Sequence, residues 1–346
     1  MFASLADAGK SQNAQRDSNA LKNVRLITTG GTIASRRDER TGDVVAGMSA
    51  DALRASLHDP LPGIAIEVEE FCNVNSYALD LLTIFALATR INEQLKSPDC
   101  DGVVITHGTD TMEESVYLTD LLLASDKPVV FTGAQRAADQ PDTDGPRNIA
   151  DAIRLAVSPA ARGLGAMICF EQEFHAARDV SKTHTSRTDT FKSWEHGKLG
   201  EIDGATVSVQ RRPVLRRSYA PRRIEPNVEL IRLAMGAGDG YLRYAADQGV
   251  RAIVLEGFGR GNTPPPVTKA AAEFIARGIP VIVTSRCPRG RVLPVYGNGG
   301  GTDLHRAGAI FAGDLSGHKA RILASVLLGL GLDMEGLRNE FEFLGG

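Results

Sequence analysis

The sequence predicts an α/β protein with an N-terminal doubly wound, mostly parallel sheet domain and a smaller C-terminal α/β domain. Short, continuously apolar runs alternate with helix-like stretches, and most of the apolar runs end in a turn rich in glycine. Such runs are typical of strands that helices cover on both faces. The chain has 346 residues, which indicates two domains at about 150 residues per domain.

The first half of the chain supplies four candidate strands and two candidate helices. The strands are expected at 24–28, 103–106, 128–132 and 166–170. Residues 81–95 carry apolar side chains at helical spacing. Residues 111–124 begin with Thr111 and Glu114, which have the spacing of a capping box, in which two side chains bond the free backbone N–H groups of a helix start.

The arginine-rich stretch 211–226 interrupts this pattern. It holds six arginines, three prolines and little apolar periodicity, which indicates a linker between domains. An arm that binds nucleic acid is the alternative, and nothing else in the chain supports it. The expected organisation is a disordered extension over 1–22, an N-terminal domain over 23–212, a linker over 213–227 and a C-terminal domain over 228–346. Within the C-terminal domain, strands are expected at 252–255, 280–284 and 309–312, before a helix at 317–328.

Composition and charge exclude several classes of protein. Hydrophobic residues make up 42% of the chain, so a wholly disordered protein is excluded. A formal net charge of −3 gives no field for gripping nucleic acid. The longest apolar run, 322–332, is too short to span a bilayer, and the N-terminal sequence lacks the pattern of a signal peptide. We therefore expect neither nucleic acid nor membrane as a partner.

The cysteines and histidines do not have metal-binding spacing. Cys72, Cys100, Cys169 and Cys287 are far apart, and no CxxC or HExxH motif is present. Buried, reduced thiols are the expected state of these cysteines. This in turn indicates a cytoplasmic protein without a metal.

Three strand ends carry unusual polar clusters, which are residues 29–32, 106–110 and 132–135. Ligands of parallel α/β sheets bind at the carboxyl ends of strands, and glycine beside a hydroxyl lets the backbone approach a small ligand closely. The helix after Asp110 would direct free N–H groups to the same place, which suits a carboxylate or a developing oxyanion. Each cluster alone is better explained as a tight turn, but their recurrence at successive strand ends favours a site.

Two further side chains have both a structural and a functional explanation. Lys192 lies between Phe191 and Trp194, and partial burial there would lower its pKa toward that of a usable base. The local sequence by itself favours a solvated surface lysine. His107, beside Gly108, is expected to be a packed structural histidine and not a base.

At this point the motifs resemble those of the bacterial-type L-asparaginase/glutaminase family. The first two, which together are strongly specific, are TGGTIA at 29–34 and HGTDTMEE at 107–114. The similarity continues through GAQR (133–136), DGPRN (144–148), RDVSKTHT (178–185), TDTFKS (188–193), GRGN (259–262), TSRCPRG (284–290) and GHKAR (317–321). It therefore covers residues 24 to about 330.

The resemblance implies an enzyme without a cofactor that hydrolyses the side-chain amide of a small-molecule substrate, L-asparagine and to a lesser extent L-glutamine. In this family pattern Thr32 is the nucleophile, and Thr109, Asp110 and Lys192 form a second hydroxyl–carboxylate–lysine set. An amide is a poor electrophile and a threonine hydroxyl a poor nucleophile, so such a site must supply a base and oxyanion donors.

The resemblance also implies how the substrate is held. Ser76 matches the contact to the substrate α-carboxylate, and Tyr77 stands where similar enzymes contact the α-ammonium together with Asp110. The backbone of Thr109 and Ala134 is expected to polarise the amide. Asn262 matches a residue that similar enzymes contribute from a neighbouring subunit, which implies a homotetramer with shared active sites.

Three departures from the family pattern and two other functions stay open at this stage. The stretch 35–44 has no tyrosine, Tyr77 stands where similar enzymes often have a polar amide, and Tyr296, Gly297 and Asn298 stand in the region where similar enzymes have an acidic residue. One alternative function is an amidase that acts on a larger amide, such as a glutaminase that feeds ammonia to a transamidation partner. The other is a non-catalytic module that binds aspartate or asparagine.

Overall fold

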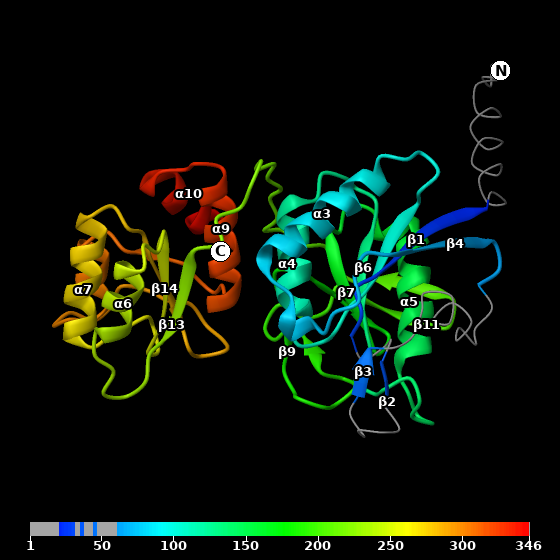
Figure 1. Ribbon diagram of the computed structural model, residues 1–346, viewed down its shortest axis with the longest axis horizontal. Coiled ribbons are helices and arrows are strands. Elements are labelled where there is room, and N and C mark those ends of the chain that lie inside the picture. The colour runs from blue at the N-terminus through cyan, green and yellow to red at the C-terminus, as the bar shows by residue number, and fades with distance from the viewer. Residues whose placement is uncertain (1–20, 32–34, 38–43, 47–60, 346) are drawn as a thin grey trace, which may run out of the picture.

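The computed structural model describes residues 21–31, 35–37, 44–46 and 61–345. It contains two α/β domains side by side, the N-terminal one coloured blue to green and the C-terminal one yellow to red (Figure 1). The extension expected over 1–22 lies outside the described residues except for Leu21 and Lys22, and Lys22 already belongs to the first strand.

The N-terminal domain is built on an eight-stranded sheet in the order β12-β11-β8-β7-β6-β5-β1-β4. Strands β7, β6, β5, β1 and β4 are parallel, and β8, β11 and β12 continue the sheet in antiparallel fashion. The four strands expected here are confirmed. The strand bounds are β1 (Lys22–Thr28), β4 (Ile64–Glu70), β5 (Gly102–Thr106), β6 (Val129–Thr132), β7 (Ala166–Phe170), β8 (Glu173–Ala176), β11 (Gly200–Asp203) and β12 (Thr206–Val209).

Helices cover both faces of this sheet, as the continuously apolar strands predicted. Alternate residues of a strand point to opposite faces, so Ile27 of β1 packs with helices α3 (Leu81–Leu95) and α4 (Met112–Leu122), while Leu26 packs with α5 (Gly145–Val157). Helix α3 has the bounds that its apolar periodicity predicted.

The capping box expected at the start of α4 is wrong. Thr111 is the N-cap residue, but its side chain makes no capping bond. Its hydroxyl instead donates to the carbonyl of Ser76 at 2.9 Å. A tertiary acceptor has therefore replaced the local one, and the bond joins the start of α4 to the short helix η3 (Ser76–Ala78).

The C-terminal domain has a four-stranded parallel sheet in the order β13-β14-β15-β16. Its expected strands and its helix over 317–328 are confirmed, and β13 was not predicted. Helix α9 lies on the side that faces the N-terminal domain and packs against α4 (Figure 1). The bounds are β13 (Val228–Arg232), α6 (Gly240–Asp247), β14 (Ala252–Gly257), α7 (Pro265–Ala276), β15 (Val281–Ser285), α8 (Gly301–Arg306), β16 (Ile310–Phe311), α9 (Gly317–Gly329) and α10 (Met334–Leu344).

Two short ribbons and a 3₁₀ turn complete the described residues. Strands β2 (Ser35–Arg37) and β3 (Val44–Ala46) pair with each other, as do β9 (Ser181–Lys182) and β10 (Phe191–Lys192). The 3₁₀ turn, η4, covers Pro159–Ala161. None of the helices in these described ranges is both long and apolar enough to cross a membrane.

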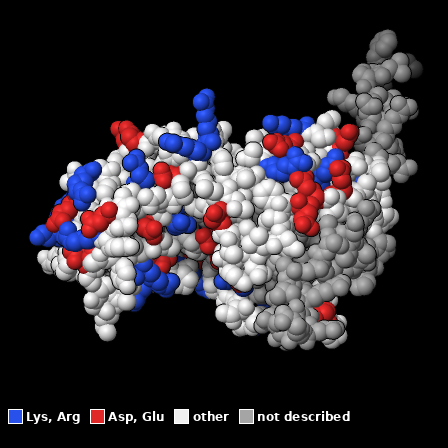
Figure 2. Space-filling view, viewed as in Figure 1, with Lys and Arg blue, Asp and Glu red and all other residues white. Residues whose placement is uncertain are grey.

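The arginine-rich stretch between β12 and β13 is paired with both domains. Arg216 forms an ion pair of 2.8 Å with Asp120 of α4, and Arg217 forms one of 2.7 Å with Glu340 of α10. On the face shown in Figure 2, basic and acidic side chains of the described residues are intermingled. The two paired guanidiniums hold this stretch against the acidic groups of the fold.

All four cysteines are free thiols, but they are not all buried as expected. Cys100 and Cys169 are buried, Cys72 is partly buried and Cys287 is exposed. Cys287 follows the end of β15, in a turn held by Ser285, whose hydroxyl accepts the backbone N–H of Cys287 at 3.1 Å. The expectation of burial is therefore correct for Cys100 and Cys169 and wrong for Cys287.

Candidate active site

Three strand ends meet at the carboxyl edge of the large sheet, as expected. A Cβ atom added to Gly31 would lie 2.4 Å from the backbone nitrogen of Gly108, and one added to Gly133 would lie 2.4 Å from the carbonyl oxygen of His107. The turns after β1, β5 and β6 are thus in backbone contact, which only glycine permits at these positions. Thr32 itself lies outside the described residues, but its neighbour Gly31 places the first turn beside Gly108.

A lysine joins the two polar residues of the middle turn. The ammonium of Lys182 donates to Thr109 Oγ1 and to Asp110 Oδ1, each at 2.8 Å. The Lys182 side chain is 12% exposed and that of Asp110 is 57% exposed. The Asp110 carboxylate is therefore open to solvent, whereas the Lys182 amine is mostly buried. Thr109 and Asp110 directly precede the N-terminus of α4.

This lysine is not the one that was expected from the sequence. Lys192 lies 3.1 Å from Glu173 of β8, and Lys182 takes the place expected for it. In the β9–β10 pair, Lys182 is opposite Phe191 and Lys192 is opposite Ser181. Because successive side chains of a strand point to opposite faces, the two lysines emerge on opposite sides of this ribbon, and only that of Lys182 faces Thr109.

Gln135, in the third polar cluster, completes the environment of the Thr109 hydroxyl. The hydroxyl donates to Gln135 Oε1 at 3.1 Å, and Gln135 Nε2 donates to the carbonyl of Arg187 at 3.1 Å. The oxygen of Thr109 thus accepts from Lys182 while its proton points to an amide oxygen. Gln135 was expected only as part of the turn, because its partner at 187 is distant in the sequence.

The turn that holds Gln135 and Ala134 is fixed by a buried carboxylate. Asp144 accepts from the backbone N–H groups of Gln135 and Arg136 at 3.0–3.2 Å and from Asn148 Nδ2 at 3.1 Å. This network explains why the DGPRN segment accompanies the GAQR turn. Ala134, which we expected to present its backbone to the substrate, is fully buried at this turn.

Ser76 lies against the middle turn, as expected for a residue of the same site. It is buried, and a Cβ atom on Gly108 would lie 2.6 Å from Ser76 Oγ. Its neighbour Tyr77 is 72% exposed, and the Tyr77 phenol accepts from Asn75 Nδ2 at 2.9 Å. The structure thus places Ser76 beside the turn that carries Thr109 and leaves the Tyr77 ring in solvent.

His107 is a packed structural side chain, as predicted. Its Nδ1 lies 2.7 Å from the carbonyl of Gly108, and its ring packs on Phe131 with centroids 5.9 Å apart. Complete burial lowers the pKa of His107 to about 4. A neutral imidazole that is closed off from solvent supports the turn and is not placed to exchange protons with a ligand.

Asn262 and Tyr296 lie in the C-terminal domain and bond within it. Asn262 pairs with Phe258 in a β-bridge and accepts the Gly301 N–H on its Oδ1 at 3.1 Å. The Tyr296 side chain is 59% exposed, and its carbonyl accepts the Thr302 N–H at 2.8 Å. These contacts of both residues thus lie within their own domain, away from Thr109.

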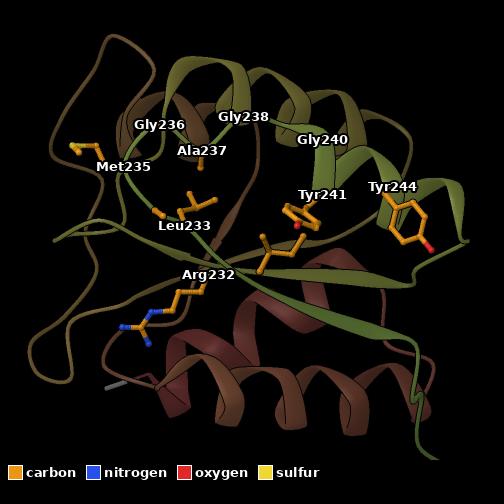
Figure 3. A pocket seen from close by; sticks show the side chains of 11 residues that line it. Arg232, Leu233, Met235, Gly236, Ala237, Gly238, Gly240, Tyr241 and Tyr244 are labelled. Atoms are coloured by element: carbon orange, nitrogen blue, oxygen red, sulfur yellow. The ribbon is translucent and has the colours of Figure 1, made fainter.

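A large apolar hollow of about 770 Å³ lies elsewhere, in the C-terminal domain (Figure 3). It is formed by the segment after β13 and by α6, with Met235, Tyr241 and Tyr244 strongly exposed. Arg232 is the charged side chain of its lining. Its lining has neither a carboxylate nor an amine, so the candidate active site is the polar cluster at Thr109 in the N-terminal domain.

Family models match both domains. The asparaginase N-terminal model covers residues 23–215, and the glutaminase/asparaginase C-terminal domain model covers residues 227–341. The chain belongs to the asparaginase family. As a member, it is a hydrolase that acts on amide bonds, and the resemblance found in the sequence is confirmed.

Relatives of this asparaginase-family chain match nearly its whole length. It is 34% identical to the L-asparaginase of Bacillus licheniformis over 92% of this chain and 99% of that one, and 37% identical to the "Probable L-asparaginase" of Deinococcus radiodurans over 93% and 98%. It is also 34% identical to a glutamyl-tRNA(Gln) amidotransferase polypeptide of Halobacterium salinarum, over 85% of this chain and 72% of that one.

A solved structure shares the fold. The structure described as "Probable Cytoplasmic L-asparaginase" from Campylobacter jejuni superposes with a TM-score of 0.83 at 28% identity, covering 93% of this chain and 99% of that chain. The predicted α/β class with its separate C-terminal domain is therefore confirmed. Within the described part of this family member, no group of three or more His, Cys, Asp or Glu side chains is arranged to hold a metal ion.

Proposed function

We propose that this protein hydrolyses the side-chain amide of L-asparagine to L-aspartate and ammonia through a threonine nucleophile, with weaker activity on L-glutamine. The observation that carries the proposal is the contact of Lys182 with both Thr109 and Asp110 at the start of α4. The L-asparaginase relatives support the choice of substrate.

In the proposed reaction the hydroxyl of Thr32 adds to the amide carbonyl carbon. Its proton passes to the leaving nitrogen, the C–N bond breaks, and ammonia departs from an acyl-threonine ester. A water molecule then adds to the ester carbonyl carbon. The ester bond to Thr32 breaks, which regenerates the Thr32 hydroxyl and releases aspartate. Thr109, Asp110 and Lys182 supply the second set: Lys182, which the Asp110 carboxylate fixes in position, holds the Thr109 hydroxyl, and this hydroxyl relays a proton from the attacking water to the departing oxygen of Thr32.

The substrate is proposed to bind by its charged ends. Buried Ser76 contacts the α-carboxylate, and exposed Asp110 contacts the α-ammonium, with Tyr77 beside it. The backbone of Thr109 and of Ala134 polarises the carbonyl. The N-terminus of α4 supports this placement, because free N–H groups there stabilise a developing negative charge.

Ammonia release by the purified protein tests this function. We expect turnover of L-asparagine above that of L-glutamine, and we expect Thr32→Ala to keep its circular dichroism spectrum and lose turnover. Tight aspartate binding by titration calorimetry without any turnover in the native protein would instead support a non-catalytic binding module. Ordinary activity in Thr32→Ala would remove the nucleophile assignment alone.

The amidotransferase relative supports a second candidate, an amidase that supplies ammonia to a transamidation partner. The chain aligns with 72% of that relative, against 98–99% of the two asparaginases. This difference in coverage favours the asparaginase. A panel of L-asparagine, L-glutamine and larger amide substrates separates the two, because the second function would show its fastest ammonia release from an amide other than L-asparagine.

We also propose a homotetramer in which Asn262 completes the site of a neighbouring subunit. The exposed apolar hollow around Met235 supports an assembly through this domain. Mixing inactive Thr32→Ala and Asn262→Ala proteins under subunit exchange would restore part of the activity if sites are shared. Sedimentation of the native protein as a monomer would contradict the tetramer.

The domain limits and the compartment are proposals as well. Independent domains over 23–212 and 228–346, joined by 213–227, are supported by the two family-model matches, and limited proteolysis in the linker tests them. A cytoplasmic location is supported by the Campylobacter structure, whereas a relative from Haemophilus influenzae is described as "Probable L-asparaginase periplasmic". Cell fractionation decides between the two compartments.

A further inference from the structure

A lysine from the C-terminal domain is buried directly behind the candidate active site. Lys319, in the first turn of α9, is 2% exposed and is among the largest fully buried side chains. Its ammonium donates to the carbonyl of Arg178 at 2.9 Å and to the carbonyl of Val180. Both acceptors belong to the N-terminal domain, so the bonds cross the domain boundary.

These two carbonyls lie on the segment that carries the site lysine. Val180 is followed by β9, whose second residue is Lys182. Strand β9 has only two residues paired to β10, so its own ladder gives it little support. The neighbouring residue Ser181 hydrogen-bonds to Glu113 of α4. The backbone before Lys182 is therefore held from the C-terminal domain and from α4.

The same end of α9 also contacts the helix that follows Asp110. His318 Nε2 lies 3.2 Å from Glu113 Oε2, and Glu113 is in the first turn of α4. The first turn of α9 thus touches both segments that meet in the Lys182–Asp110 ion pair. Its contacts are with groups that lie only a few residues from the pair.

The buried ammonium of Lys319 is stabilised by the groups around it. Burial lowers the pKa of Lys319 to about 8, and Glu113 and Asp179 oppose that shift. The Tyr117 ring, with its centroid 5.8 Å from the ammonium, closes the third side. An uncharged side chain of similar length would fill this space without the cost of removing a charge from water. What the ammonium adds is its pair of hydrogen bonds to the carbonyls of Arg178 and Val180.

We propose that Lys319 is a positioning residue for the amide hydrolysis, which fixes from the C-terminal domain the backbone that presents Lys182 to Thr109. The inference rests on the proposed function. It assigns to the GHKAR segment the role of coupling domain docking to the geometry of the active site. Lys319 itself touches no reacting atom.

Steady-state kinetics of Lys319→Met test the inference. A misplacement of about 1 Å at a reacting group costs on the order of 100-fold, so we expect kcat for L-asparagine to fall about 10-fold to 100-fold. KM and the calorimetric affinity for L-aspartate are expected to change by less than about 3-fold, because Ser76 and Asp110 remain in place. The matched control is Arg217→Met, which removes the ion pair between the linker and Glu340 of α10, a pair that shares no residue with the contacts of Lys319.

A double-variant cycle separates positioning from general destabilisation. If Lys319 acts through Lys182, Lys319→Met lowers the activity of the native protein, but it does not lower further the residual activity of the Lys182→Met variant. Equal losses in both backgrounds, or a kcat within about 2-fold of native in folded Lys319→Met, would overturn the inference. If Lys319→Met does not fold, Ser181→Ala takes its place, with an expected loss of about 3-fold to 10-fold in kcat and none in the Lys182→Met background.

The cycle also separates this inference from the proposed function. Full activity in Lys182→Met, or no ammonia from L-asparagine in the native protein, contradicts the proposed function itself. An inactive Lys182→Met together with a fully active Lys319→Met contradicts only the inference. An unchanged kcat in folded Ser181→Ala also counts against it.

Discussion

The ammonium of Lys182 lies 2.8 Å from the carboxylate of Asp110, although the two residues are 72 positions apart along the chain. The same ammonium lies 2.8 Å from the hydroxyl of Thr109. These contacts join the turn after β5 to the two-residue strand β9 of a separate ribbon. The proposed reaction depends on them, and the first prediction tests them.

Lys182→Met is expected to lower kcat/KM for L-asparagine by about 10²-fold to 10⁴-fold, the usual contribution of a positioned acid–base group. Lys192→Met is the matched control, since Lys192 is paired with Glu173 on the other face of the ribbon and should change activity by less than about 3-fold. Ammonia release measured for both variants checks this. The reverse ranking would restore Lys192 as the site lysine.

Gln135→Met is expected to lower kcat by about 10-fold, because the Thr109 hydroxyl loses the acceptor that orients its proton. Gln94→Met is the control, because Gln94 of α3 donates to Glu69 of β4 and makes no contact with Thr109. Kinetics at saturating L-asparagine measure the effect. Equal kcat values for the two variants would show that the orientation of Thr109 does not depend on Gln135.

Gly133→Ala is expected to destabilise the protein by about 1–3 kcal/mol, because the new Cβ would overlap the His107 carbonyl and force the two turns apart. The same displacement should reduce turnover. Gly238→Ala, where a Cβ atom would meet nothing within 4 Å, should have little effect on either property. Urea unfolding midpoints and ammonia release report the two properties. A Gly133→Ala protein of native stability would contradict the close packing of the turns.

Two histidines that are buried in the described part of the chain, His107 and His175, predict a loss of stability in mild acid. Burial lowers the pKa of His107 and of His175 to about 4, so the unfolded chain binds protons below about pH 6.5 while the folded chain does not. The unfolded state then holds more protons, and stability falls as the pH falls through this window. From pH 7 to pH 5 the loss is about 2 kcal/mol per histidine.

Urea unfolding at pH 7 and at pH 5 measures this loss. A folded His175→Gln variant should lose about 2 kcal/mol less than the native protein over that interval. His305→Gln is the control, since His305 is exposed in α8. The same acid sensitivity in His175→Gln as in the native protein would show that this imidazole does not stay neutral in the fold.

The fold was predictable where a local pattern decides it. The continuously apolar strands and the periodicity of α3 indicated the correct elements, and the Gly-rich turns marked the correct edge of the sheet. Elements such as β9 and β13 were missed, because a two-residue strand has no period and β13 is only partly buried at an edge. Their pairing depends on neighbours that are distant in the sequence.

The site was predictable only in part, for a related reason. Thr109, Asp110 and Ser76 were correctly expected to share a neighbourhood, since each follows or contacts the end of β5. The choice between two nearby lysines depends on which face of a short ribbon each occupies, and no local pattern in RDVSKTHT or TDTFKS shows that register. Lys182 belongs to a motif that the family shares, but nothing around it in the sequence shows which partner its ammonium meets.

By itself, the sequence determined the α/β class, the family and the edge of the sheet where polar turns gather, because burial, backbone freedom and turn chemistry are properties of neighbouring residues. The tertiary structure decided which amine faces Thr109, where the Thr111 hydroxyl finds its acceptor, and that α9 of the second domain supports the site from behind. These outcomes depend on strand register and domain packing, in which a shift of one residue moves a side chain to the opposite face.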